Sequence, residues 1–189
     1  AGVGFSTDAV DSPTIDRGDV SASIGDETIP NGGRPNLGSY GQTAEASQSL
    51  LLCPQTVYVR QAGGADATTI QGALGQIANP LTSHACVVIE DSGVYTEQVT
   101  VQRFVNNGSS ITIMLDPAIT LHPVIEPPAG STAGFVIRNA SVNIVNIDVA
   151  PAAAVQYGIF VSSPNVTLSS VNVDGGINIA RAGIALSSW

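Results

Sequence analysis

The chain has 189 residues, of which 43% are hydrophobic but only 5% aromatic, and all six basic residues are arginine. This length suits one domain, or one domain with an extended arm, whose core must use small and β-branched side chains. The net charge of −9 argues against binding to nucleic acid or anionic lipid, because few groups could neutralise phosphates. No stretch reaches the ~18 apolar residues that a membrane-spanning helix needs, so we expect no membrane insertion.

Residues 1–49 form a polar, turn-rich segment in which no helical or strand period persists. Its few apolar residues cannot offset the entropy of ordering, so we expect an extended arm that lies on another surface. Several aspartates crowd this arm, and Asp16 and Asp19 could hold a calcium ion that orders it. Their spacing matches no EF-hand loop, however, and favours a solvated acidic turn region. We expect no other cofactor.

Residues 50–189 are predicted to form the folded body, which begins with a strand at 56–60 and a short helix at 70–77. Apolar residues at the i, i+3, i+4 and i+7 positions predict the helix, with Thr68 or Thr69 as its N-cap and Asn79-Pro80 at its end. Two internal glycines weaken this helix, so it needs tertiary support. Further strands are expected at 86–90, 97–101, 110–115 and 119–121.

The last third of the body contains an internal repeat of alternating β-branched residues. The pattern of residues 134–149 is repeated in residues 158–174, and a third copy begins at Gly183. The leading glycines of the three copies are 24 and 25 residues apart. A period of roughly 20–30 residues with this alternation is typical of a parallel β-solenoid, in which each period is one rung. Inward Val, Ile and Leu would stack between rungs, and outward Asn, Ser and Thr would face water.

Cys53 and Cys86 are the two cysteines, and they flank the expected helix. A disulfide between them would clamp that helix and add about 3–4 kcal/mol through loop closure. Two buried free thiols are the alternative, because cysteine is often a small buried hydrophobic residue. An even pair in a lysine-free chain favours an oxidising compartment, so we expect an extracellular or cell-surface protein.

Three segments carry a resemblance to known β-helix proteins. Residues 68–74 read Thr-Thr-Ile-Gln-Gly-Ala-Leu, and residues 88–99 read Val-Ile-Glu-Asp-Ser-Gly-Val-Tyr-Thr-Glu-Gln-Val. They resemble the capping helix and the first rung entry of the pectate lyase and pectin methylesterase superfamily. Residues 12–41 resemble the segment that follows the last rung in bacterial surface β-helix proteins. The resemblance implies an all-β, right-handed parallel β-helix with one short N-terminal capping helix, but the fold hosts enzymes, adhesins and structural proteins.

Residues 12–41, which resemble a closing segment, precede the body in this chain. The last rung of the body begins at Gly183, and no segment that could cover it follows in the sequence. We therefore expect the arm of one copy to dock on the open C-terminal rung of a neighbour in a head-to-tail homopolymer. This predicts a structural subunit of an extracellular filament or surface layer, with itself as partner. Two alternatives stay open: the arm folds back on its own rung, or the chain is one period of a longer tandem protein. The expected interface residues are Phe5, Ile15, Leu37, Tyr40, Ile184, Leu186 and Trp189.

A carbohydrate-binding or carbohydrate-acting β-helix protein, with a polysaccharide as partner, is the alternative function. An exposed row of aromatic residues or a cluster of carboxylates on one face of the solenoid would indicate this function. The aromatic residues available for such a row are Tyr95, Phe104, Tyr157 and Phe160.

Esterase-like catalysis would need two aspartates and an arginine on one sheet face. The candidates are Asp116, Asp148, Asp174, Arg138 and Arg181. Asp148 and Asp174 are 26 residues apart, about one rung, which favours stacked turn formers over catalysis. The catalytic motifs of the superfamily have no counterpart here, so we expect no enzyme activity.

Overall fold

The computed structural model describes residues 18–19, 22–23, 25–26, 35–44, 46 and 53–187. The chain divides into two compact units, Ala1–Leu52 and Cys53–Trp189. The first unit contains the expected arm and the second contains the expected body.

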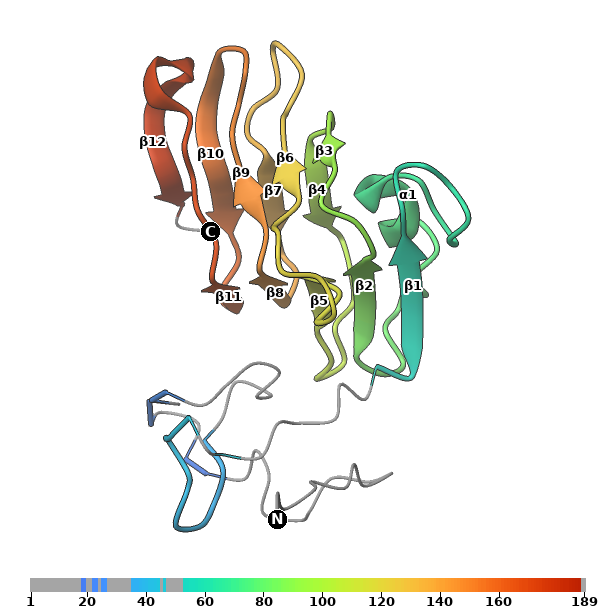
Figure 1. Ribbon diagram of the computed structural model, residues 1–189, viewed down its shortest axis with the longest axis vertical. Helices are drawn as coiled ribbons and strands as arrows, with labels where there is room; N and C mark the ends of the chain where they lie inside the picture. Colours follow the sequence, from blue (N-terminus) through green and yellow to red (C-terminus); the bar gives the residue numbers. More distant parts are fainter. Residues whose placement is uncertain are drawn as a thin grey trace, which may run out of the picture. The chain divides into compact units, whose positions relative to one another are not determined.

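Residues 53–187 form a parallel β-solenoid of about five turns, with three sheets as its sides (Figure 1). The β1 sheet has the order β1-β2-β5-β8-β11, with β1 (Gln55–Val59), β2 (Ala85–Ile89), β5 (Ile111–Leu115), β8 (Val142–Val145) and β11 (Val166–Ser169). The β12 sheet has the order β12-β10-β7-β4, with β4 (Val99–Gln102), β7 (Phe135–Arg138), β10 (Val155–Ser162) and β12 (Ile179–Leu186). The β3 sheet has the order β3-β6-β9, with β3 (Val94–Tyr95), β6 (Val124–Ile125) and β9 (Asp148–Val149).

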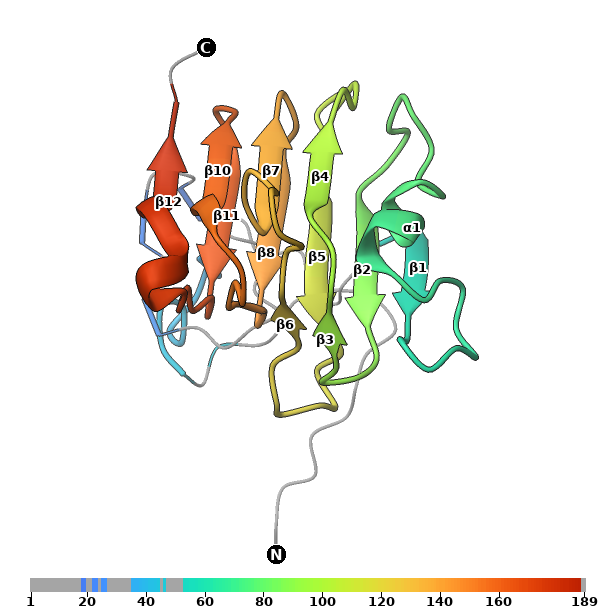
Figure 2. The same cartoon turned by 90° about the horizontal axis from the view of Figure 1, so that it is seen from above.

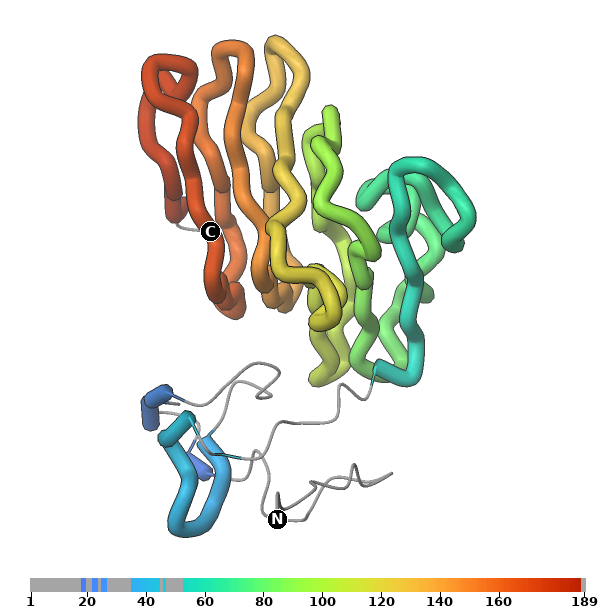
Figure 3. The backbone as a smooth tube through the Cα atoms, viewed as in Figure 1, coloured from blue at the N-terminus to red at the C-terminus, as the bar shows by residue number. Residues whose placement is uncertain are grey.

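The path of the chain confirms the solenoid that the internal repeat predicts. Every strand pairing between these elements is parallel, and successive turns lie next to one another along the solenoid (Figure 3). In the β12 sheet, β12, β10, β7 and β4 lie side by side, and β1 and α1 lie at the opposite end of the solenoid (Figure 2).

The core consists of apolar side chains stacked from rung to rung. Val99, Phe135 and Ile159 share one register position of the β12 sheet, and all three are fully buried. Burial of such a side chain contributes about 1.5–3 kcal/mol, so the stacks rather than local propensity hold these short strands in place. The sparse aromatic content therefore suits the fold, since a narrow solenoid interior favours Val and Ile.

Stacked glycines mark the corner where the chain enters the β12 sheet. Gly134 donates its N–H to the Gly158 carbonyl oxygen at 2.8 Å, and Gly183 occupies the equivalent place one rung further on. A Cβ atom on Gly158 would lie 2.2 Å from Val173 Cγ1 and 2.6 Å from the Gly183 carbonyl oxygen. The repeated glycine thus removes a side chain where the neighbouring rung comes too close for one.

The capping helix α1 (Ile70–Leu74) is shorter than the expected 70–77. Thr69 is the N-cap, and its side chain accepts the Gly72 N–H at 3.0 Å. The helix ends at Gly75, because the glycines at 72 and 75 give it little intrinsic stability. The next two residues continue in i→i−3 hydrogen bonds, and Ile77 is still buried, so the apolar periodicity identified the buried face correctly.

The strand expected at 119–121 is wrong. This stretch is a loop in which Leu121 is largely exposed, and the next strand, β6, begins only at Val124. Asp116 forms the turn that prevents a strand, since its carboxylate accepts the Ala118 N–H at 2.8 Å and its carbonyl accepts the Ile119 N–H at 2.9 Å. The strand expected at 97–101 is confirmed with shifted bounds, since β4 spans Val99–Gln102.

A disulfide joins Cys53 to Cys86, as one of the two sequence interpretations predicts. The bond links the start of the solenoid to β2 across 33 residues that include β1 and α1. Closing a loop of this size contributes about 3.5–4 kcal/mol in the chain-entropy account. The capped end of the solenoid is therefore covalently reinforced.

Candidate assembly site at the C-terminal rung

The last rung consists of β11, the 3₁₀-helix η1 (Gly176–Asn178) and β12. β11 pairs with β8, and β12 pairs with β10. Within residues 53–187, each of these two strands has one edge without a strand partner. Unpaired backbone N–H and C=O groups at such an edge can bind a further strand.

Two side chains on β12 occupy core positions but are exposed. Ile184 aligns with Ile159, and Leu186 aligns with Val161, and both of these β10 residues are buried. In contrast, Ile184 is 49% exposed and Leu186 is 82% exposed. The stack that buries these positions in the inner rungs is thus open on one side at β12.

The rest of the rung extends this apolar surface. Val166, Leu168, Val171 and Val173 are partly buried against the core, whereas the equivalents of the first two on β8 are fully buried or nearly so. We call these residues together with Ile184 and Leu186 the apolar end surface. It has the composition of a solenoid core cut between two rungs.

The other end of the solenoid is covered. Val57 and Val59 on β1 are buried, and α1 packs there with Ile70, Ala73 and Leu74 buried. Glu97 fastens this helix, since its two carboxylate oxygens accept the Ile70 and Gln71 N–H groups, each at 2.8 Å. One end of the solenoid is therefore capped by the described residues and the other is not.

The arm unit presents apolar side chains of its own. Leu37 is 53% exposed and Tyr40 is 66% exposed, in a turn segment held by a hydrogen bond from the Gly41 N–H to the Gly38 carbonyl. All four expected interface residues that the structure describes are thus exposed: Leu37, Tyr40, Ile184 and Leu186. The remaining three, Phe5, Ile15 and Trp189, lie outside the described residues.

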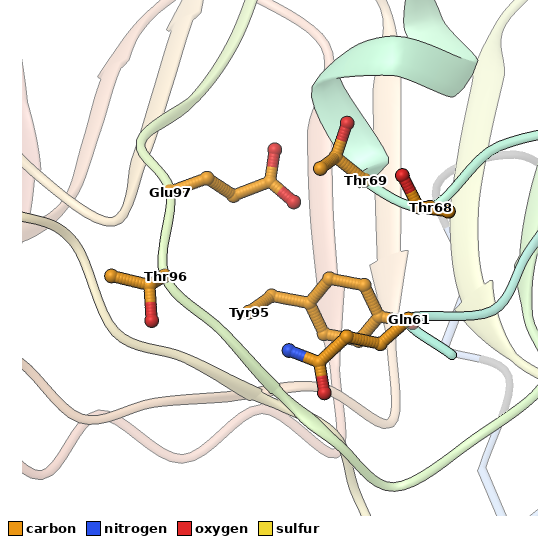
Figure 4. Close-up of a pocket in the computed structure, with 6 residues that line it drawn as sticks. All are labelled: Gln61, Thr68, Thr69, Tyr95, Thr96 and Glu97. Atoms are coloured by element: carbon orange, nitrogen blue, oxygen red, sulfur yellow. The ribbon is translucent and has the colours of Figure 1, made fainter. Parts of the chain in front are cut away.

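A small pocket of about 310 Å³ lies beside the start of α1, and its lining is Gln61, Thr68, Thr69, Tyr95, Thr96 and Glu97. Figure 4 shows the Glu97 carboxylate directed toward the start of the helix and the Tyr95 ring next to Gln61. The Tyr95 hydroxyl donates to Asp91 at 2.9 Å, and burial, followed by this hydrogen bond, raises its pKa well above the ordinary value. Glu97 and Tyr95 are therefore engaged in holding the cap and the first rung together.

The structure disperses the aspartates that an esterase-like site would need. Asp116 lies in the turn after β5, whereas Asp148 lies on β9 in the β3 sheet. Asp148 and Asp174 do not stack, because Val149 pairs with Val173 and so places Asp148 beside Asn172. The 26-residue spacing between the two aspartates predicted stacking, which is wrong because the rung here is 24 residues long.

Asp148 instead forms a polar cluster between neighbouring rungs. Its carboxylate lies 2.9 Å from His122 Nδ1 and accepts from the Asn172 side chain at 2.8 Å. Burial on its own would raise the pKa of Asp148, but the hydrogen bonds from His122 and Asn172 outweigh burial and lower it. The cluster ties the loop before β6 to the last two rungs.

Arg138 and Arg181, the basic members of the esterase candidates, lie on the β12 sheet together with Tyr157 and Phe160. Both aromatic rings are partly exposed, and their centroids are 5.2 Å apart. Of the aromatic residues that the sequence offers for an exposed row, Tyr95 is buried, whereas Tyr157 and Phe160 are not. The two arginines and this aromatic pair come together through the register of β7, β10 and β12, and that register is the signal from which their proximity could have been predicted.

Other site predictions depend on few described residues. Asp19 is exposed, and Asp16, the other calcium candidate, lies outside the described residues. Among the residues that the structure describes, no three His, Cys, Asp or Glu side chains come together as a metal site. In the same part of the chain, no helix has the length and hydropathy to cross a membrane. The disulfide is consistent with an extracellular location.

No protein-family model matches the chain, and no curated protein or solved structure shows significant similarity to it.

Proposed function

We propose that this protein is a structural subunit of an extracellular filament or surface layer. Each subunit docks its N-terminal arm on the C-terminal rung of a neighbour, and repetition of this contact builds a head-to-tail polymer. The observation that carries the proposal is the exposure of Ile184 and Leu186 at register positions that are buried in every inner rung.

Two kinds of interaction support docking at this rung. The free edges of β11 and β12 offer main-chain hydrogen bonds, which give affinity in strand addition. The apolar end surface offers the burial that accompanies it, and single side chains such as Leu186 can each contribute about 2 kcal/mol. An arm that supplies both would convert an exposed edge into an inner rung.

The arm has suitable features for this role. It resembles the segment that closes β-helices in bacterial surface proteins, and it exposes Leu37 and Tyr40. The arm and the rung are different surfaces of the same chain, so the contact is heterologous. Heterologous contacts produce open filaments unless the rotation between subunits closes a ring.

An extracellular setting agrees with the chemistry of the chain. The disulfide is stable in an oxidising compartment, and the lysine-free, acidic composition keeps a polymerising protein soluble before assembly.

Sedimentation velocity and electron microscopy of the full chain test the proposal. We expect association that increases with protein concentration and is lost when residues 1–41 are deleted, while the far-UV circular dichroism of the body stays the same. A full chain that is monomeric at all concentrations, and whose state does not change on deletion of residues 1–41, would refute the polymer. Closure of the arm on its own rung gives that monomeric result.

A further inference from the structure

The outer side of the β12 sheet has an unusual charge distribution for this protein. Its four strands, β4, β7, β10 and β12, contain Arg138 and Arg181 and no acidic residue. The whole chain has 15 acidic residues and a net charge of −9. We call Arg138, Tyr157, Phe160 and Arg181 the arginine–aromatic patch.

The two arginines reach the aromatic pair from opposite directions along the strands. Arg138 on β7 aligns with Ser162, beyond Phe160, and its guanidinium carbon lies 5.7 Å from the Phe160 ring centroid. Arg181 on β12 precedes Ala182, the partner of Tyr157, and donates to the Tyr157 hydroxyl at 3.3 Å. The two rings, whose centroids are 5.2 Å apart, thus hold both guanidinium groups.

Neither guanidinium group has a carboxylate partner among the described residues. The ion pair that arginine forms in this part of the chain is Arg60–Glu90, at 3.1 Å near the opposite end of the solenoid. Arg138 and Arg181 are both exposed, so their charges face solvent. Positive groups with aromatic neighbours and no acids nearby are suited to an anionic partner, because such complementarity steers and orients binding.

We propose that the arginine–aromatic patch binds the acidic stretch of the arm, residues 8–27, of the neighbouring copy. This inference rests on the proposed polymer and adds a second contact to the rung edge. The stretch contains six acidic residues and one arginine, so its charge is opposite to that of the patch. Arg181 and Tyr157 lie on the last two rungs, so an arm that adds to β12 passes next to them.

The sequence of the stretch offers a carboxylate and an apolar side chain that can meet the patch together. Asp11 and Ile15 are four residues apart, so they lie on the same face of an extended segment. Asp11 would then reach a guanidinium group, and Ile15 would lie against the rings.

The test compares full-length variants that lose one or two positive charges. The patch variants are Arg181→Gln and the double variant Arg138→Gln/Arg181→Gln. Arg60→Gln is the matched control, since Arg60 already pairs with Glu90 away from the C-terminal rung. Sedimentation velocity at low and at moderate ionic strength gives the protein concentration of half-assembly for each, and circular dichroism checks folding.

We expect the double variant to raise the concentration of half-assembly by about tenfold at low ionic strength, as two partly exposed ion pairs would. Arg181→Gln should show part of this effect and Arg60→Gln none, and added salt should reduce the difference. Charge reversal provides a rescue: Arg181→Asp and Asp11→Arg should each weaken assembly, and a chain with both should regain much of it.

The outcomes separate this inference from the polymer itself. If the wild-type chain assembles and the patch variants assemble equally well, the patch contact is overturned and the polymer survives. If the wild-type chain does not assemble at all, the proposed function fails and this inference fails with it. A third outcome is that the chain binds an acidic polysaccharide such as alginate, that this binding needs Arg138 and Arg181, and that assembly is unaffected when both are replaced. This result would overturn the arm as the occupant of the patch in favour of a glycan.

Discussion

Replacement of Leu186 by serine should weaken assembly while leaving the fold of the subunit intact. Leu186 is 82% exposed, so the subunit already leaves most of this side chain in water. The substitution removes only the burial of the remaining part of the side chain, roughly a fifth of it. This loss lowers the unfolding free energy by about 0.5 kcal/mol or less.

The effect on assembly is larger because docking would bury the exposed part. Full burial of a leucine side chain contributes about 1.5–3 kcal/mol, so burial of the exposed 82% contributes about 2 kcal/mol. At 1.4 kcal/mol per factor of ten, the concentration of half-assembly should rise by about 30-fold. Ile184→Ser should have a smaller effect on assembly, because half of that side chain is already buried in the subunit.

Sedimentation velocity over a range of protein concentrations measures this change, and chemical denaturation measures subunit stability. Leu121→Ser is a matched control, because Leu121 is 69% exposed but lies in the loop before β6 rather than on the last rung. A role for Leu186 in docking would be refuted if Leu186→Ser and Leu121→Ser had the same effect on assembly, or if Leu186→Ser acted only by unfolding the subunit.

Three further predictions concern the solenoid itself. Gly158→Ala should lower the unfolding free energy by about 1–3 kcal/mol, because its Cβ would lie 2.2 Å from a Val173 methyl group; Gly183→Ala, with 3.6 Å to the same group, should change denaturant stability little. Glu97→Ala should cost about 1–3 kcal/mol in the same assay by leaving two N–H groups of the capping helix unpaired, and an unchanged midpoint would contradict that role. The pKa of Asp148 is lowered in the folded protein, so the ionised carboxylate stabilises the fold at pH values above its ordinary pKa of 3.8. This stabilisation is lost as the pH falls further through the lowered pKa. The stability difference between wild type and Asp148→Asn should therefore shrink toward pH 3, and a difference independent of pH would contradict the assignment.

The rungs could be predicted from the sequence because their cause is periodic. The 24- and 25-residue glycine spacing reflects a steric requirement that recurs on each turn, as the contacts of Gly158 show. The buried face of the capping helix was predictable for the same reason, since Ile70, Ala73 and Leu74 lie at helical spacing. The polar cap from Glu97 depends on a contact across 27 residues, which no local pattern reveals.

Errors arose where local geometry overrides the alternation of apolar residues. Ile119 and Leu121 have strand-like spacing, but the Asp116 turn directs them into a loop. A rung length taken as 26 residues misplaced Asp148 by two positions, because a solenoid register depends on each turn and not on an average period. The arginine–aromatic patch depends on the register of three strands together and so could not be predicted from any one of them.

The measurement that most directly tests the account is photo-crosslinking between copies that differ in isotope label. A benzophenone amino acid in place of Tyr40, which is exposed in the arm unit, reports what this arm contacts in the assembled protein. Mass spectrometry of a mixture of ¹⁴N- and ¹⁵N-labelled chains then shows whether each crosslink joins one copy or two. We predict crosslinks from position 40 to residues 166–186 that join differently labelled chains. Crosslinks confined to chains of the same label, or none to that rung, would contradict polymerisation through the arm.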